Sequence, residues 1–198
     1  METSLNLDKI EQRAWTAYFE DGLVDICLGL LLLGGGIRML ADNVWYNFIV
    51  LAGVLILAAG KRLVTFPRLG RVKFGPSRRI RNRKVLLIGA AAMIATFVLL
   101  VFALMGKAPS RTVTAPVFGF GFILLFGLIA YFTEFNRLYF YAFLTGVTWY
   151  LIELRDNSVG PVASVIAGCI ALGIGIIMLG RFIRRYPVLG REEADDRS

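Results

Sequence analysis

The sequence predicts an all-α integral membrane bundle of six transmembrane helices, preceded by a short N-terminal amphipathic helix, with both termini in the cytoplasm. Three observations predict this fold: the apolar composition, the recurrence of uncharged segments long enough to span a membrane, and the gathering of Lys and Arg on one side. Of the 198 residues, 57% are hydrophobic and 18% are charged, against about 45–50% apolar and about 25% charged in soluble domains. Helices are the expected spanning element, because a helix satisfies its own backbone hydrogen bonds in lipid.

The first 21 residues are polar and of mixed charge, and they lack the apolar core and cleavage site of a secretory signal peptide. Apolar residues recur there at helical spacing beside charged ones, which indicates an amphipathic helix at the membrane interface. A cytoplasmic cap packed on the bundle is the alternative. We therefore expect three parts: a cytoplasmic amphipathic segment (1–21), a single six-helix domain (22–184) and a cytoplasmic tail (185–198).

Six apolar segments are predicted to cross the membrane. The clearest, 85–105, carries no charge along a length close to the roughly 20 residues that a spanning helix needs. The second and fifth reach that length if the helix continues into flanking residues such as Lys61–Val64 and Glu153–Leu154. The first is the least regular, because the triplet Gly34–Gly36 lowers its helix propensity. The predicted spans are 22–40, 44–64, 85–105, 115–132, 138–154 and 161–180.

The distribution of Lys and Arg predicts the orientation. With six spans, the N-terminus, the loop 61–84, the loop 133–137 and the C-terminus share one side, which carries 18 of the 22 basic residues. The positive-inside rule places that side in the cytoplasm. An odd number of spans would put the basic C-terminal cluster on the other side. The expected location is the inner (cell) membrane of a prokaryote, as a multi-pass protein.

The loop 61–84 holds ten basic residues and no acidic residue. Near an anionic leaflet each such residue contributes about 1 kcal/mol of binding. Three interpretations remain open: a signal for orientation alone, contact with anionic lipid headgroups, and contact with a protein partner or a second copy of the chain. Nucleic acid is not expected, because no reading helix or stacking module accompanies the charges. The predicted contact residues are Arg68, Arg71, Lys73, Arg78, Arg79, Arg81, Arg83 and Lys84.

Part of this loop, 61–71, recurs without a gap at 181–191 and shares the pattern aromatic-Pro-x-Leu-Gly-Arg. Each copy follows a predicted span that ends in glycine, so the same helix exit, proline stop and turn are expected twice. Duplication of a two-helix unit and chance similarity both remain open. The first copy, Phe66-Pro67-Arg68-Leu69-Gly70-Arg71-Val72-Lys73, resembles a loop in small uncharacterised prokaryotic polytopic membrane proteins. This resemblance implies a membrane fold and no particular activity.

Ionisable residues inside spans are costly and are candidates for function. Asp25 lies about one turn inside the first predicted span, and Asp21 lies on nearly the same face. These carboxylates either take a proton or a cation, or pair with Arg137, Arg181 or the basic loop; pairing is the favoured interpretation. On the other side of the membrane, Arg38 is expected to meet Glu153 or Asp156. The possible ion or salt-bridge residues are Asp21, Asp25, Arg38 and Glu153.

Small residues predict where the helices approach one another. Ala167, Ala171 and Gly175 form a small-xxx-small stripe along the sixth span. The triplet Gly34–Gly36 permits either close packing or a helix break like those of some transporters, and packing is favoured. Cys27 and Cys169 both fall in predicted spans and are expected to pack rather than to form a disulfide.

Three classes of function follow. Histidine is absent and cysteine occurs twice, which excludes His-ligated metals and Ser-His-Asp or Cys-His catalysis. We expect no metal, no cofactor and no enzyme activity, and favour a scaffold or accessory subunit whose basic cytoplasmic face contacts anionic lipid or a protein. The first alternative is a small transporter or channel using Asp25 and the Gly34–Gly36 break. The second is a lipid-acting enzyme using Asp21, Asp25 or Glu134, which lacks a nucleophile–base pair.

Overall fold

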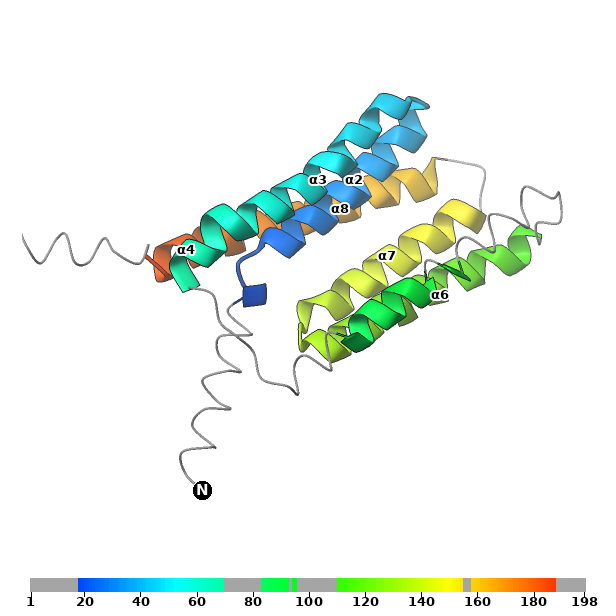
Figure 1. Ribbon diagram of the computed structural model, residues 1–198. Helices are drawn as coiled ribbons and strands as arrows, with labels where there is room; N and C mark the ends of the chain where they lie inside the picture. Colours follow the sequence, from blue (N-terminus) through cyan, green and yellow to red (C-terminus); the bar gives the residue numbers. More distant parts are fainter. Residues whose placement is uncertain (1–17, 70–82, 93, 96–109, 155–157, 188–198) are drawn as a thin grey trace, which may run out of the picture.

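The computed structural model describes residues 18–69, 83–92, 94–95, 110–154 and 158–187. These residues form helices and turns, without a strand among them, so the described fold is all-α (Figure 1). Residues 83–92 are helical. The other helices are α2 (Leu23–Ala41), the 3-10 helix η1 (Val44–Tyr46), α3 (Asn47–Gly60), the π-helical η2 (Lys61–Thr65), α4 (Phe66–Leu69), α6 (Arg111–Thr133), α7 (Arg137–Leu154) and α8 (Val159–Arg185).

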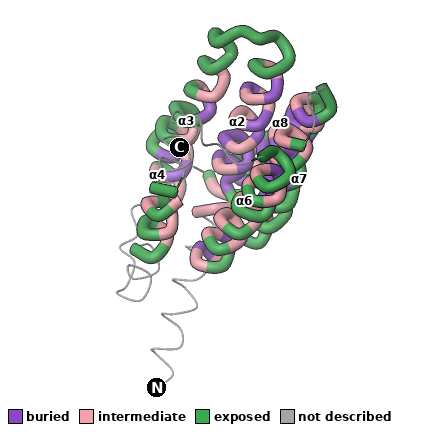
Figure 2. Tube along the Cα trace, turned by 90° about the vertical axis from the view of Figure 1, so that its right-hand side faces the viewer, coloured by how far each residue is buried: buried purple, intermediate pink, exposed green. Residues whose placement is uncertain are grey.

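The helices form two packed groups. Helix α2 packs against α8 and α3, α6 packs against α7, and α7 contacts α8 and so joins the groups. Helix α2 begins, and α4 and α8 end, at one end of the bundle, where the α6–α7 corner also lies (Figure 1). We call it the ion-pair end, after Asp21, Asp25, Lys61 and Arg137, and call the opposite end the far end. Buried residues gather where α2, α7 and α8 meet, while the outer sides of α3 and α6 are exposed (Figure 2).

Small residues let α2 and α8 pack closely. A Cβ atom added to Gly29 would lie 2.7 Å from the backbone nitrogen of Leu172, and one added to Gly168 would lie 2.6 Å from that of Leu33. The predicted stripe on α8 is buried, which confirms that this stripe is a packing face. Its counterpart on α2 is a series of glycines seven residues apart, which matches a helix face that keeps returning to the same partner. These glycines are Gly22, Gly29 and Gly36.

The triplet Gly34–Gly36 lies within α2, which continues through it to Ala41. A Cβ at Gly34 would come within 3.0 Å of Ile49 on α3, and one at Gly36 within 2.7 Å of the Pro161 carbonyl on α8. The packing interpretation is therefore confirmed. The helix break, considered as the alternative, does not occur.

The second predicted span continues past Gly60, as the sequence suggested. Residues Lys61–Thr65 form a π-helical turn, in which the Phe66 N–H bonds the Lys61 carbonyl, and α4 follows with Pro67 inside it. The predicted proline stop is therefore wrong for the first copy of the repeated element, because the wider π turn carries the chain on before the proline. At the second copy α8 ends at Arg185, just before Pro187.

Four helical segments are long and apolar enough to cross a membrane: Leu23–Ala41, Val44–Leu69, Arg111–Thr133 and Val159–Arg185. Large apolar side chains on their outer faces are exposed, such as Phe120 at 71%, which suits contact with lipid tails rather than water. These segments give the chain the character of a multi-pass membrane protein. Helix α7 has 18 residues but bears Arg137 and Glu153 and many aromatic residues, and most of the third predicted span lies outside the described residues.

Candidate functional site

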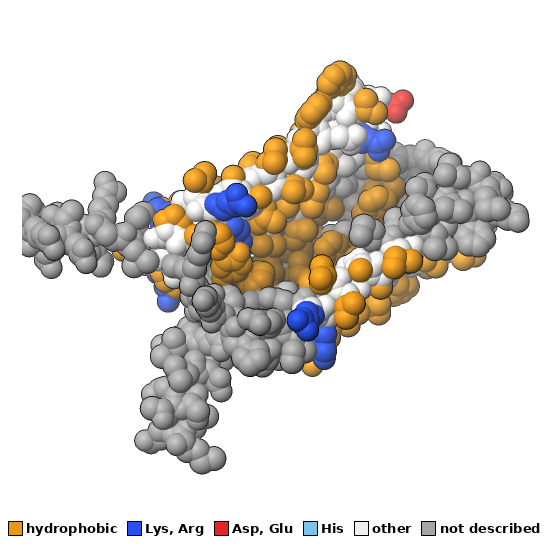
Figure 3. All heavy atoms as spheres, viewed as in Figure 1, with side chains coloured by type: hydrophobic (Ala, Val, Ile, Leu, Met, Phe, Trp, Pro, Cys, Tyr) orange, Lys and Arg blue, Asp and Glu red, His pale blue; other side chains and the backbone are white. Residues whose placement is uncertain are grey.

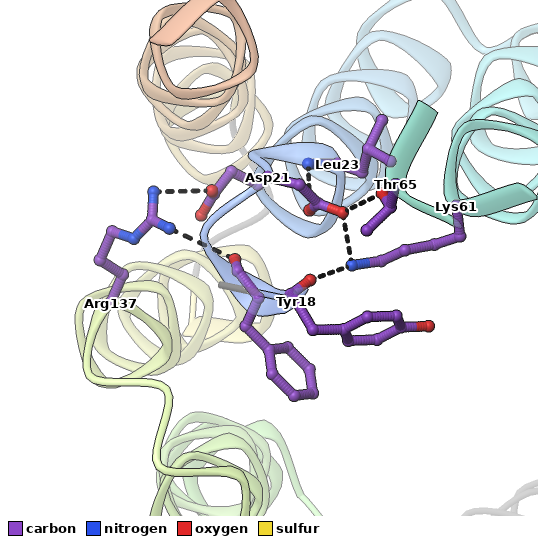
Figure 4. Close-up of polar contacts among 8 residues, drawn as sticks. Tyr18, Asp21, Leu23, Lys61, Thr65 and Arg137 are labelled. Atoms are coloured by element: carbon purple, nitrogen blue, oxygen red, sulfur yellow. Dashed lines mark hydrogen bonds and ion pairs between the residues drawn. The ribbon is translucent and has the colours of Figure 1, made fainter. Parts of the chain in front are cut away.

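The chain entering α2 turns sharply so that Asp21 faces inward. Gly22 precedes the helix with φ 77°, and an added Cβ there would overlap the Gly175 carbonyl of α8, so this position requires glycine. Asp21 is completely buried. Its Oδ1 accepts a hydrogen bond from the Leu23 N–H at 3.1 Å, and its Oδ2 accepts from Lys61 Nζ and Thr65 Oγ1, both at 2.6 Å (Figure 4). Asp21 therefore ties the start of α2 to η2.

The ammonium group of Lys61 is nearly enclosed and has partners besides Asp21. Its Nζ also donates to the Tyr18 carbonyl and lies 3.9 Å from the centre of the Tyr18 ring, which stacks on Phe66. Burial, together with the nearby Asp21 carboxylate, raises the pKa of Tyr18, so its phenol stays neutral. The Lys61 side chain is only 11% exposed. This pair is closed to solvent.

Asp25 forms a second pair one helical turn further along α2. Its Oδ2 accepts a hydrogen bond from Arg137 Nη1 at 2.9 Å, and Arg137 Nη2 donates to the Phe19 carbonyl at 3.3 Å (Figure 4). Arg137 begins α7 and is 24% exposed, whereas Asp25 is fully buried. Asp25 Oδ1 and the Tyr141 hydroxyl are both buried; the carboxylate and the hydroxyl interact, but neither atom makes a hydrogen bond of standard geometry within the described residues. The second pair is therefore only partly satisfied.

The predicted contact between Arg38 and Glu153 is wrong. Arg38 is exposed at the far end of α2, while Glu153 accepts a hydrogen bond from Thr114 Oγ1 at 2.6 Å. Glu153 therefore joins the end of α7 to the start of α6, because α7 packs mainly against α6 and α2 packs against α3 and α8. Asp156, the other expected partner, lies outside the described residues.

The predicted lipid-contact residues are only partly within the described structure. Arg68 is half-buried on α4, and its Nε has no hydrogen-bond partner. Arg83 and Lys84 are exposed at the start of the helix 83–92, and Lys84 Nζ lies 5.5 Å from the centre of the Phe132 ring. The rest of these residues lie outside the described part: Arg71, Lys73, Arg78, Arg79 and Arg81.

Sequence reasoning missed two features of this end. It counted Lys61 with the basic loop, although that side chain points inward and pairs with Asp21; the position of Lys61 directly after an uncharged run was the available signal. It also assigned no role to a cleft of about 260 Å³ beside Arg137. The cleft is lined by Glu20, Arg137, Met178, Arg181, Phe182, Arg185 and Tyr186.

The described residues contain no group of three His, Cys, Asp or Glu side chains that could hold a metal ion. Cys27 is buried and Cys169 is exposed, and neither is in a disulfide. Cys27 therefore packs inside the chain as expected, whereas Cys169 faces outward.

Comparison of the chain with family models, curated proteins and solved structures found no match.

Proposed function

We propose that this chain is a six-span protein of the prokaryotic inner membrane, a non-enzymatic scaffold or accessory subunit that binds anionic lipid at its ion-pair end. The charge distribution carries this proposal. Among the described residues, the ion-pair end has nine Lys and Arg and four Asp and Glu, while the far end has two of each sign. Two of the four carboxylates are buried in the ion pairs. Lys and Arg side chains accordingly show on the surface around this end (Figure 3).

The positions of the described helix ends support six crossings. Helix α4 finishes with Leu69 at the ion-pair end, and α6 starts with Arg111 at the far end, and we infer one further crossing between them. Lys84 lies beside Phe132, near the end of α6, which puts the start of the helix 83–92 at the ion-pair end. The start of α2 and the end of α8 both lie at that end, as an even number of crossings with α7 counted as a span requires. The positive-inside rule then favours the cytoplasm for it.

Anionic lipid is the ligand that best fits exposed cations at a membrane boundary. Each Lys or Arg close to an anionic leaflet contributes about 1 kcal/mol, and a guanidinium can bind two phosphate oxygens at once. The remaining basic residues of the loop adjoin the same end in sequence.

The two alternative functions lack a supporting observation. A transporter using Asp25 would need a site open to ions, but Asp25 is paired with Arg137 and α2 has no break. A lipid-acting enzyme would need a free carboxylate among its candidates, but Asp21 accepts three hydrogen bonds, Asp25 is in an ion pair, and Glu134 also has an interaction partner. A protein partner is an outcome that the experiment below separates from lipid.

The test compares lipid binding by the purified full-length protein with that of a variant in which Arg78, Arg79, Arg81 and Arg83 are all Gln. We expect the parent to bind phosphatidylglycerol more tightly than phosphatidylcholine, and the variant to lose at least about tenfold of that affinity at low salt, since exposed charges are screened as salt rises. The matched control neutralises the four basic residues of the predicted opposite side: Arg38, Lys107, Arg111 and Arg155. An unchanged preference in the loop variant would leave the loop an orientation role and reject lipid binding through it.

A further inference from the structure

We propose that the cleft beside Arg137 binds the phosphodiester headgroup of an anionic lipid, with Arg181 and Arg185 as its principal ligands. This inference rests on the proposed function, since it names the place at the ion-pair end where one lipid molecule is held. Three arginines from two helices line the cleft: Arg137 at the start of α7, and the other two in the last turns of α8.

The arginines of α8 are arranged to act together on one ligand. Arg181 and Arg185 are four residues apart, so they lie on the same face of α8. Both are exposed, and neither forms an ion pair within the described part of the chain. Arg137 is already held by Asp25 and the Phe19 carbonyl. Its guanidinium is therefore fixed beside the cleft before a ligand binds, so that binding does not cost the conformational entropy of this side chain. Paired, fork-shaped guanidinium donors are the groups that proteins use for phosphate oxygens.

The net charge of the cleft favours a singly charged anion. Asp25 balances Arg137 from behind, and Glu20 lies in the lining without an ion pair to any of the arginines. The groups that face the cleft therefore retain about one net positive charge. A lipid phosphodiester carries one negative charge, whereas free inorganic phosphate at neutral pH is a mixture of singly and doubly charged ions. The cleft thus suits the headgroup better than the free ion.

The rest of the lining suits the apolar part of a lipid. Met178 and Phe182 line the cleft beside the arginines, and the Phe182 ring lies 5.0 Å from that of Tyr186. The Arg185 guanidinium lies 5.9 Å from the centre of the Tyr186 ring. Tyrosine and long basic side chains are typical of the membrane boundary, where one end of the side chain is apolar and the other is wet.

The experiment measures phosphatidylglycerol and phosphatidylcholine binding to the full-length protein in detergent, by thermal stabilisation on titration. The test variant is Arg181→Gln with Arg185→Gln. Its control is Arg62→Gln with Arg184→Gln, which removes the same charge from exposed residues of the same end that do not line the cleft. We expect the test variant to lose about tenfold in phosphatidylglycerol affinity and the control to lose less than about threefold.

Further arms keep the result decisive. Arg181→Lys with Arg185→Lys retains the charge but not the paired N–H donors of the guanidinium groups, and we expect a loss of phosphatidylglycerol affinity between those of the control and the Gln variant. This variant also tests the site if the Gln variant fails to fold. Titration with inorganic phosphate distinguishes the sources: binding of the free ion as tight as that of the lipid would overturn the headgroup assignment. Equal losses of phosphatidylglycerol affinity in the test and control variants would show non-specific electrostatic attraction and would overturn the assignment of the cleft as the binding site. A parent without preference for phosphatidylglycerol would instead reject the proposed function itself.

Discussion

Asp21 and Asp25 lie four residues apart at the start of α2, are both fully buried and both pair with a cation from another helix. Their surroundings differ. Asp21 accepts from a backbone N–H, a hydroxyl and an ammonium group, so both of its oxygens are bonded. Asp25 accepts from Arg137 through one oxygen, and the other makes no hydrogen bond of standard geometry in the described residues, although the Tyr141 hydroxyl interacts with this carboxylate.

The difference teaches that a buried charge in a membrane protein need not be a transport site. A closed pair such as Asp21–Lys61 fixes how α2, η2 and the chain before α2 meet. The Asp25–Arg137 pair reaches the surface through an arginine that also lines the cleft. We interpret the first pair as structural and the second as a support for ligand binding. This comparison predicts unequal costs when each pair is broken.

The largest effect is expected from Lys61→Met. The change leaves the Asp21 carboxylate buried without its cation, and breaking a buried pair in this way costs about 3–5 kcal/mol. The free energy of unfolding, measured in detergent by denaturant titration, should fall by that amount. Arg62→Gln is the control, because Arg62 is the exposed neighbour in the same π turn; it should change stability by less than about 0.5 kcal/mol.

A second variant separates the lost pair from lost packing. Adding Asp21→Asn to Lys61→Met removes the uncompensated charge, keeps an acceptor oxygen for the Leu23 N–H and offers an amide N–H to the Thr65 hydroxyl, which can also accept, so stability should partly recover. If Lys61→Met were no more harmful than Arg62→Gln, the description of this pair as a structural lock would be wrong.

A smaller loss is expected from Asp25→Asn. The change leaves the Arg137 cation without its carboxylate, but that side chain is 24% exposed, so water in the cleft can solvate it. We expect a loss of about 1–3 kcal/mol, the cost of replacing a hydrogen bond between two charged groups by one to a neutral amide rather than that of burying a bare charge. The measurement is the same denaturant titration, beside Lys61→Met. A cost equal to or above that of Lys61→Met would show that the two pairs are equally closed.

Much of the fold could be predicted from the sequence because spanning segments leave a direct signal in composition. Uncharged length, glycine and alanine stripes and the extension through Lys61–Val64 are local properties. The π turn is not, since the contacts that its Lys61 and Thr65 side chains make are to Asp21, a residue distant in sequence. The sequence also could not show that Pro67 lies within a continuing helix.

The sequence predicts those features of the candidate site that depend on the position of a residue within a single helix. The burial of Asp25 follows from its place in α2, and Arg137 was among its proposed partners. Which of ten neighbouring cations turns inward, however, depends on the packing of separate helices, so Lys61 was grouped with the loop. The predicted Arg38–Glu153 contact failed for the same reason: charge at the same membrane boundary does not show which helices are neighbours.

The smallest effect, and the most sensitive test of the comparison, is expected from Tyr141→Phe. The Tyr141 hydroxyl is buried and makes no hydrogen bond of standard geometry within the described residues, although it interacts with the Asp25 carboxylate, so its removal costs at most one weak contact. We expect the free energy of unfolding to stay within about 1 kcal/mol of the parent or to rise. Thr65→Val, which removes the hydroxyl bound to Asp21, should cost about 1.5–3 kcal/mol, because hydrogen bonds to charged groups are the stronger ones. If the two hydroxyls proved equally costly to remove, Tyr141 would be supporting the second oxygen of Asp25, and the two pairs would be alike after all.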